Sequence, residues 1–418
     1  MKLNYRRTIN IGLAFMGISA FWQIYDNIIP LILKNSFDFG ETATGAIMAA
    51  DNILAIVLLP LIGAWSDKID TRIGKRTPFI IVGTLLSVIF MMLIPLADKI
   101  GSIGFFIAAL GIVLVSMGIY RSPAVALMPD LTPPQLRSQG NAVINVMGAL
   151  GAIYSLGMIQ ILVKHEERPD YTSLFLSVAG VMVIALVVLV CTIREKKLAS
   201  VIAKEYPEFK KEEEQGGKIS ADVKKSLFFA LAAVFFYYIS YNGVTTAFSR
   251  YAQEVWGLMG GSFSTSLLVV AVAAFVSYIP LGALAARIGR KKTIAIGFAI
   301  MIFSFIVLTP YDHFHWTIYL WFAIIGVGGS AVGVNIFPVV VDMCSDGELG
   351  KYTGLYYTFS MAAQIVTPVL SGALLEHISY RTLFPYAAVF SILGLGTMYF
   401  VRHGDSKPSG KILESLDN

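Results

Sequence analysis

Twelve long apolar runs, separated by polar segments, constrain this 418-residue chain more than any other feature. Most of them reach the ~20 residues that an α-helix needs to cross a bilayer, and a helix satisfies its own backbone polar groups in lipid. Only 14% of the residues are charged, against about 25% in soluble domains. The sequence therefore predicts an all-α membrane protein with twelve transmembrane helices. The runs are residues 10–33, 43–65, 77–97, 102–128, 141–163, 172–193, 227–249, 262–286, 293–309, 316–341, 353–375 and 382–401.

Basic residues gather in every second loop of this pattern. They precede the first run and follow the second, fourth, sixth, eighth, tenth and twelfth runs, whereas the other loops mix fewer cations with acids, as in KHEERPD. Cytoplasmic loops carry the excess of Lys and Arg in membrane proteins. We therefore expect a multi-pass protein of the plasma membrane with both termini in the cytoplasm. The net charge of +5 belongs to these loops and does not indicate nucleic-acid binding.

The two halves of the chain are related by an internal repeat. RIGKR at residues 72–76 follows the second run, and RIGRK at residues 287–291 follows the eighth, 215 residues later. The same offset carries Pro123 onto Pro338. We predict two pseudo-symmetric six-helix bundles, residues 1–193 and 226–402, joined by a cytoplasmic linker at 194–225 that includes a surface helix, and a cytoplasmic tail at 403–418. Parallel six-helix halves with a cavity between them are a transporter architecture.

The loop SDKIDTRIGKRTPFI, residues 66–80, is crowded with charge between two apolar runs. Its cations would anchor the loop in the cytoplasm. An acidic residue such as Asp67 at a membrane-helix end is costly unless it is paired. Because Gly74 permits a tight turn, we expect the cations of the loop to fold back toward Asp67.

This loop, G-x-x-x-D followed by R-x-G-K-R, resembles the loop signature of the major facilitator superfamily, with KIDT inserted before Arg72. Together with YRSPAVALMPDLTPPQLRSQGN at residues 120–141, it resembles the plant sucrose transporters and, more distantly, the glycoside–pentoside–hexuronide cation symporters. The resemblance implies alternating access and a cytoplasmic gate. The gate residues would be Gly63, Asp67, Arg72, Gly74, Arg76 and Asp130. The second half has Ala286 where the aspartate would stand, so we expect a weaker gate there.

Three ionisable residues lie within apolar runs: Asp26, Asp51 and Arg121. Intramembrane ionisable residues are the default candidates for a functional site. At a rise of ~1.5 Å per residue, both acids lie in the outer half of the membrane and Arg121 lies below them. We expect them to couple transport to a proton, although either acid could instead cap an outer helix end. The fourth run carries no acid of its own in GIVLVSMGIY, where plant sucrose transporters have one, so uniport or coupling to sodium also remains open.

A sugar site would combine aromatic faces with amides and hydroxyls. Residues of this kind occur in the first, fourth, seventh and eleventh runs, and lipid-facing packing is the alternative for each aromatic residue. The predicted substrate-binding residues are Gln23, Tyr25, Arg121, Tyr238, Tyr241, Asn242 and Gln364.

The sequence contains no P-loop, no metal-ligand spacing and no catalytic constellation. We therefore expect no enzyme activity, no metal and no cofactor. The leading interpretation is a monomeric secondary transporter for proton-coupled import of a sugar or glycoside, with a disaccharide favoured. An efflux carrier for amphipathic molecules is the second interpretation, and its cavity would be more apolar. A membrane-embedded enzyme or sensor would need a catalytic cluster or an attached soluble domain.

Overall fold

The helices of the protein follow the apolar runs closely. The computed structural model describes residues 3–133, 136–205, 220–343 and 349–405. Eleven stretches of these residues are helical, long and apolar enough to span a membrane. The 31-residue helix α1 is the twelfth, and its apolar sequence is interrupted by Gln23, Asp26 and Asn27. The predicted all-α, twelve-helix architecture is confirmed.

The helices before the predicted linker are α1 (Tyr5–Asn35), α2 (Glu41–Met48), α3 (Ala50–Lys68), α4 (Thr77–Met91), α5 (Leu93–Ile100), α6 (Ile103–Asp130), α7 (Arg137–Leu162) and α8 (Thr172–Thr192). Two spans consist of two helices each. One span is interrupted at Ala49, between α2 and α3, and the other at Met92, between α4 and α5. The later helices are α10 (Ala221–Trp256), α11 (Ser264–Ile288), α12 (Arg290–Leu308), α13 (Thr317–Val341), α14 (Leu349–His377) and α15 (Leu383–Phe400).

The predicted linker contains one helix, α9 (Glu195–Glu205). Residues 206–219 of the linker and 406–418 of the tail lie outside the described residues. The chain divides into two compact units. The first comprises Met1–Gly40, Ala50–Phe209 and Leu258–Thr265, and the second comprises Glu41–Ala49, Lys210–Gly257 and Ser266–Asn418. The units thus divide within the expected linker, but two short segments are grouped with the other unit.

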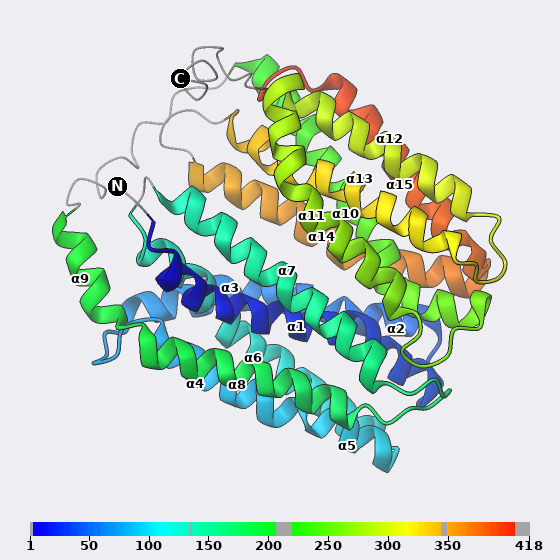
Figure 1. Cartoon of the computed structure of the whole chain (residues 1–418), viewed down its shortest axis with the longest axis horizontal. Coiled ribbons are helices and arrows are strands. Elements are labelled where there is room, and N and C mark those ends of the chain that lie inside the picture. The colour runs from blue at the N-terminus through cyan, green and yellow to red at the C-terminus, as the bar shows by residue number, and fades with distance from the viewer. Residues whose placement is uncertain (1–2, 134–135, 206–219, 344–348, 406–418) are drawn as a thin grey trace. The chain divides into compact units, whose positions relative to one another are not determined.

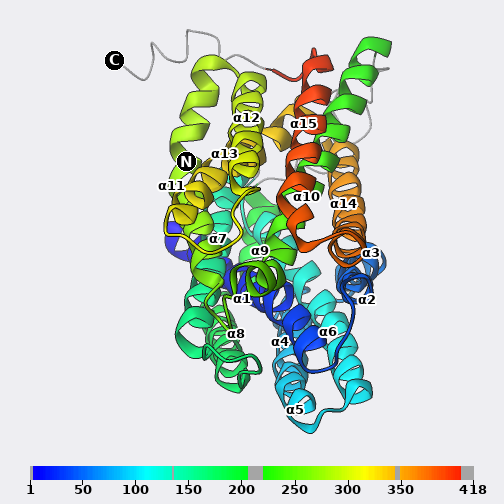
Figure 2. The same cartoon turned by 90° about the vertical axis from the view of Figure 1, so that its right-hand side faces the viewer.

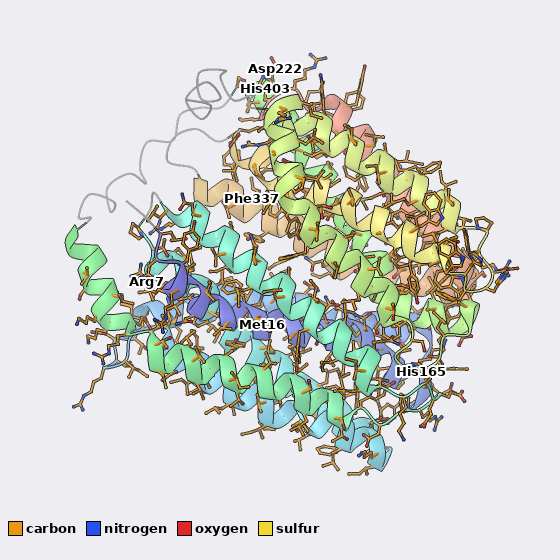
Figure 3. The ribbon with its side chains drawn as sticks, viewed as in Figure 1. Arg7, Met16, His165, Asp222, Phe337 and His403 are labelled. Carbon is orange, nitrogen blue, oxygen red and sulfur yellow. The ribbon has the colours of Figure 1, made fainter. Side chains whose placement is uncertain are left out.

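In the first unit, α1 is packed against α6, α7 and α8 (Figure 1). A Cβ at Gly151 of α7 would overlap the carbonyl oxygen of Met16 on α1, so glycine allows the two backbones to meet. Figure 3 labels Met16 on α1. The hydroxyls of Tyr120 on α6 and Ser155 on α7 donate to carbonyls of α1, each at 2.7 Å. These contacts hold α1 against α6 and α7 just before its polar residues.

In the second unit, α10 is packed against α14 and α15, and α12 against α13 and α15. The hydroxyl of Ser240 donates to the carbonyl of Ala387 at 2.8 Å, which ties α10 to α15. Helix α2 lies beside α14 (Figure 2). A Cβ at Gly45 would overlap the carbonyl of Pro368, and a Cβ at Gly372 would overlap that of Glu41. Because glycines on both helices allow this close approach, α2 is grouped with the second unit.

Candidate functional site

Arg76, at the start of α4, is the centre of the charged loop. Its side chain is only 8% exposed. Its Nε donates to Asp130 at 2.9 Å, and its two terminal nitrogens donate to Asp67 and to the hydroxyl of Ser66. The carbonyl of Gly63 also accepts from Arg76, at 3.4 Å. We call Asp67, Arg76 and Asp130 the gate cluster.

The structure thus brings together four of the six predicted gate residues, Gly63, Asp67, Arg76 and Asp130. Arg72 does not join them: its side chain is exposed and makes no ion pair within the described ranges. The role of these residues as a gate stays a prediction.

Gly74 forms the turn that leads into Arg76 and the start of α4. The φ of Gly74 is +126°. The carboxylate of Glu195, at the start of α9, lies against this glycine. It accepts backbone N–H groups from Lys75, Arg76 and Thr77 at 2.7, 2.9 and 2.8 Å. Backbone N–H groups at a helix start otherwise lack partners, and a negative charge is favoured there. Glu195 therefore fastens the loop to the end of the sixth membrane span.

Sequence reasoning missed Glu195 because it assigned the residue to a linker. The available signal was an acidic residue placed directly after the sixth apolar run. Glu195 is 4% exposed despite its charge, which is the mark of a side chain with fixed partners.

We expect Gly74→Ala to destabilise the protein by about 1–3 kcal/mol, the usual range for a strained backbone residue. Alanine disfavours this φ, and its Cβ would also overlap the Glu195 carboxylate. The measurement is the unfolding midpoint of purified protein in detergent. Gly101→Ala is the matched control, because Gly101 also has a positive φ but open space around a Cβ. Equal effects of the two substitutions would contradict the overlap with Glu195.

The second unit has a related but smaller arrangement. Gly289, which aligns with Gly74 at the offset of 215 residues, has φ +96°. Asp405 accepts the backbone N–H of Lys291 at 3.2 Å. Arg290 pairs with Asp342, and both side chains are about one-third exposed. Within the described residues, the first unit therefore has the more buried arginine and the larger number of carboxylate contacts; the weaker second gate remains a prediction.

A second charged group lies within the membrane spans of the first unit. The guanidinium carbon of Arg121 lies 5.7 Å from the centre of the Trp22 ring, which is cation–π distance. Arg121 interacts electrostatically with Asp51, and Asp51 with Asp26. We call Trp22, Asp26, Asp51 and Arg121 the polar cluster. All three predicted coupling residues belong to it.

The polar cluster adjoins a small cavity. Trp22, Asp51 and Arg121 line it together with apolar side chains such as Leu58 and Met117, and its volume is about 10 Å³. This is roughly the volume that one water molecule requires. The Nδ2 of Asn52 donates to Asp51 at 2.7 Å, so the carboxylate has an amide partner as well as a cation nearby.

The other predicted residues of the first unit lie on α1 next to this cluster. Tyr25 is 1% exposed, stacks with Phe21 and meets the Trp22 ring edge-on. It also interacts electrostatically with Asp26 and Asp51. Gln23 accepts hydrogen bonds from Asn27 through its side-chain and backbone oxygens, at 3.4 and 3.0 Å. Tyr25 is therefore a buried neighbour of the carboxylates, whereas Gln23 is half-buried.

Two of the predicted residues of the second unit, Tyr238 and Tyr241, belong to a group of tyrosines. The hydroxyls of Tyr238 on α10 and Tyr356 on α14 are 3.0 Å apart. Tyr241 stacks on Tyr237, with ring centres 5.7 Å apart. We call these four residues the tyrosine cluster.

The two amides of the second unit lie on the same helices as the tyrosine cluster. The carbonyl of Asn242, next to Tyr241, accepts from Thr246 at 2.7 Å. Gln364 lies about two turns along α14 from Tyr356, and its Nε2 donates to the carbonyl of Ser360 at 3.2 Å.

Sequence reasoning also missed a buried ion pair in the second unit. Arg250 on α10 and Glu41 on α2 lie 2.5 Å apart and are 2% and 5% exposed. The hydroxyl of Tyr380 donates to the other oxygen of Glu41 at 2.5 Å. The signal that identified Arg121, an arginine at an apolar stretch, was present here too. It was missed because the predicted seventh run ended at residue 249, whereas α10 continues to Trp256.

The described residues contain no group of three or more His, Cys, Asp or Glu side chains that could hold a metal ion. The polar cluster contributes two carboxylates, those of Asp26 and Asp51, which interact electrostatically. A pair of carboxylates in a low-dielectric site suits a proton well, because one proton removes the repulsion between them.

The model of the Major Facilitator Superfamily matches residues 11–277 and 230–415 of the chain. The chain belongs to the major facilitator superfamily. One similar solved structure is a POT family transporter in complex with 5-aminolevulinic acid. The two share 12% sequence identity and a TM-score of 0.71, over 94% of this chain and 96% of the other. At this identity, the likeness shows the fold alone.

Relatives by sequence include sugar carriers. Over 156 residues, which are 33% of this chain and 26% of the relative, the chain is 29% identical to the sucrose transport protein SUC3 of Arabidopsis thaliana. The match thus spans about a quarter of that relative's length. Over 414 residues, 94% of this chain and 96% of the relative, it is 22% identical to the uncharacterized major-facilitator-type transporter MJ1317 of Methanocaldococcus jannaschii. The predicted resemblance to sucrose transporters is confirmed.

Proposed function

We propose that this superfamily member is a secondary active transporter that imports a sugar or glycoside, preferably a disaccharide, together with a proton. The observation that carries the proposal is the polar cluster, in which two carboxylates and an arginine interact within the membrane spans of one unit. The similarity to a sucrose transport protein supports the substrate class. In this proposal the protein is a carrier without enzymatic chemistry, acts in the plasma membrane and has cytoplasmic termini.

Coupling follows from the electrostatics of the polar cluster. Two carboxylates close to each other in a medium of low dielectric repel when both are ionised. A proton on Asp26 or Asp51 removes this repulsion and changes the electrostatic attraction between the carboxylates and Arg121. Since a bound species shifts a conformational equilibrium only through its differential interaction with the two states, the proton acts by favouring one arrangement of Arg121 over another.

Sugar recognition needs apolar faces and oriented polar groups. In the first unit Trp22 offers a ring face, and in the second unit, considered by itself, the tyrosine cluster offers several. Arg121 supplies donors in a planar fork. The amides of Gln23, Asn242 and Gln364 supply both donors and acceptors.

The proposal is tested by uptake of labelled sucrose or maltose into proteoliposomes. We expect uptake to rise with an inward proton gradient and to lose this rise when a protonophore collapses the gradient. An uptake rate that is the same with and without the proton gradient would rule out proton coupling. A thermal-shift screen in which no mono- or disaccharide raises the unfolding temperature would rule out a sugar. Outward movement of amphipathic dyes would instead favour the efflux carrier, for which the aromatic surface of the tyrosine cluster is also suited.

The gate cluster leads to a separate prediction for Arg76→Ala. Charged hydrogen bonds contribute about 1.5–3 kcal/mol each. Without Arg76, the conformation that contains its bonds to Asp67 and Asp130 would be less stable relative to the other conformations of the transport cycle. We expect at least about a tenfold slower transport cycle with sugar affinity at equilibrium unchanged. Transport rate and equilibrium binding are measured on the same preparation. Lys75→Ala is the control, because that neighbouring side chain is exposed. Loss of sugar binding in Arg76→Ala would refute the gate role.

A further inference from the structure

A basic cleft lies at the end of α8, away from the polar cluster, and has a volume of about 540 Å³. Four basic side chains line it: Arg72 from the loop before α4, Arg194 after α8, and Lys196 and Lys197 on α9. Arg194, Lys196 and Lys197 have no part in the proposed transport, and Arg72, although predicted as a gate residue, does not join the gate cluster. We call this site the basic cleft.

The positive charge of the basic cleft is largely uncompensated. Lys196 pairs with Asp70 at 3.0 Å. Arg72, Arg194 and Lys197 have no carboxylate partner within the part of the chain that the structure describes. The neighbouring Glu195 is occupied, since it already accepts three backbone N–H groups and the hydroxyl of Thr77. Three exposed cations therefore face the cleft with their donors available to an anion.

The position of the basic cleft points to the membrane–water interface. It lies where the span of α8 ends at Thr192 and that of α4 begins at Thr77. Helix α9 continues from α8 at a steep angle (Figure 1). Val190 is both part of the cleft lining and exposed on α8.

An exposed apolar stripe leads from the basic cleft along α8. Ile184, Val187 and Val190 are 64%, 52% and 40% exposed. Their spacing of three residues places them on one side of the helix. In a membrane span, exposed aliphatic side chains of this kind face the acyl chains of lipids. The basic cleft and the apolar stripe are thus continuous. The cleft suits a charged lipid headgroup, and the stripe suits its acyl chains.

We propose that the basic cleft binds the phosphodiester headgroup of an anionic phospholipid, with its acyl chains along Ile184, Val187 and Val190. Arginine matches phosphate oxygens with a planar fork, and lysine adds a mobile point charge. Basic pockets between transmembrane helices at the membrane surface bind anionic headgroups in this way. A bound headgroup would neutralise the mutual repulsion of Arg72, Arg194 and Lys197 and hold α9 against the loop before α4.

The test is a lipid titration of purified full-length protein in an uncharged detergent. Phosphatidylglycerol is compared with phosphatidylcholine, and bound lipid is measured by native mass spectrometry and by the unfolding temperature. We expect phosphatidylglycerol to bind preferentially and to raise the unfolding temperature. In the double variant Arg194→Gln/Lys197→Gln we expect its affinity to fall about tenfold or more. The variant Lys164→Gln/Arg168→Gln removes two exposed charges from the loop between α7 and α8 and should retain wild-type affinity.

Three results would overturn the proposal. In the first, phosphatidylcholine binds as tightly as phosphatidylglycerol. In the second, Arg194→Gln/Lys197→Gln keeps the wild-type affinity for phosphatidylglycerol. In the third, inorganic phosphate or glycerol phosphate binds as tightly as the lipid, which would make the cleft a site for soluble anions. The assay involves no sugar and no proton gradient, so it is independent of the proposed transport function.

Discussion

Arg250→Met is expected to destabilise the second unit by about 3–5 kcal/mol, the cost of removing one partner of a buried ion pair. Glu41 is 5% exposed, so its carboxylate would lose the Arg250 guanidinium and stay buried. The Tyr380 hydroxyl would still donate to its other oxygen. The measurement is denaturant-induced unfolding of the protein in detergent, compared with the unchanged chain.

The double variant Glu41→Leu/Arg250→Met is the control for this prediction. Replacing both members of a buried pair by apolar residues is often neutral or stabilising, so we expect it to recover most of the stability that Arg250→Met loses. Additive losses from Glu41→Leu and Arg250→Met would show that the two charges do not depend on each other. No effect of Arg250→Met alone would contradict the buried ion pair.

Of the two variants Asp26→Asn and Asp51→Asn, at least one is expected to abolish accumulation of sugar against its gradient and to spare exchange. An asparagine keeps the shape of the side chain but cannot release a proton. With one proton per sugar and a gradient of one pH unit, the unchanged protein can concentrate sugar about tenfold. At least one of the two variants should reach an internal concentration about equal to the external one.

This second prediction is measured in proteoliposomes, as accumulation and as exchange of labelled for unlabelled sugar. Asn52→Ala serves as the control, because it removes a hydrogen bond to Asp51 but keeps the carboxylate. It should retain accumulation. If both aspartate variants concentrate sugar normally, the coupling role of the polar cluster is wrong.

The membrane spans could be predicted from sequence because the bilayer imposes a local rule. Each span must be apolar over about 20 residues, and this can be seen without knowledge of its neighbours. The sixth run was predicted at 172–193, and α8 covers Thr172–Thr192. Interruptions such as those at Ala49 and Met92 were not predicted, since they leave the hydropathy of a span unchanged.

The site could be predicted only where its partners are close in the chain or share a motif. Asp67 and Arg76 are nine residues apart, and the motif of the loop pointed to both. Glu195 lies 119 residues from Arg76, so only the fold shows that they meet. The same is true of Glu41 and Arg250. Arg121 was recognised because an arginine at that depth has few structural explanations, but only the fold shows that it lies beside the Trp22 ring.

The carboxylate behind Gly74 has a consequence for biosynthesis. Chains are made from the N-terminus, and folding begins during synthesis. Glu195 follows α8, the last membrane helix of its bundle, and Asp405 follows α15, the last helix among the residues that the structure describes. Each glycine turn therefore lacks its carboxylate partner until every helix of that bundle has been synthesised. The acid that arrives last completes the turn, so each bundle becomes fully fastened only when it has been made in full.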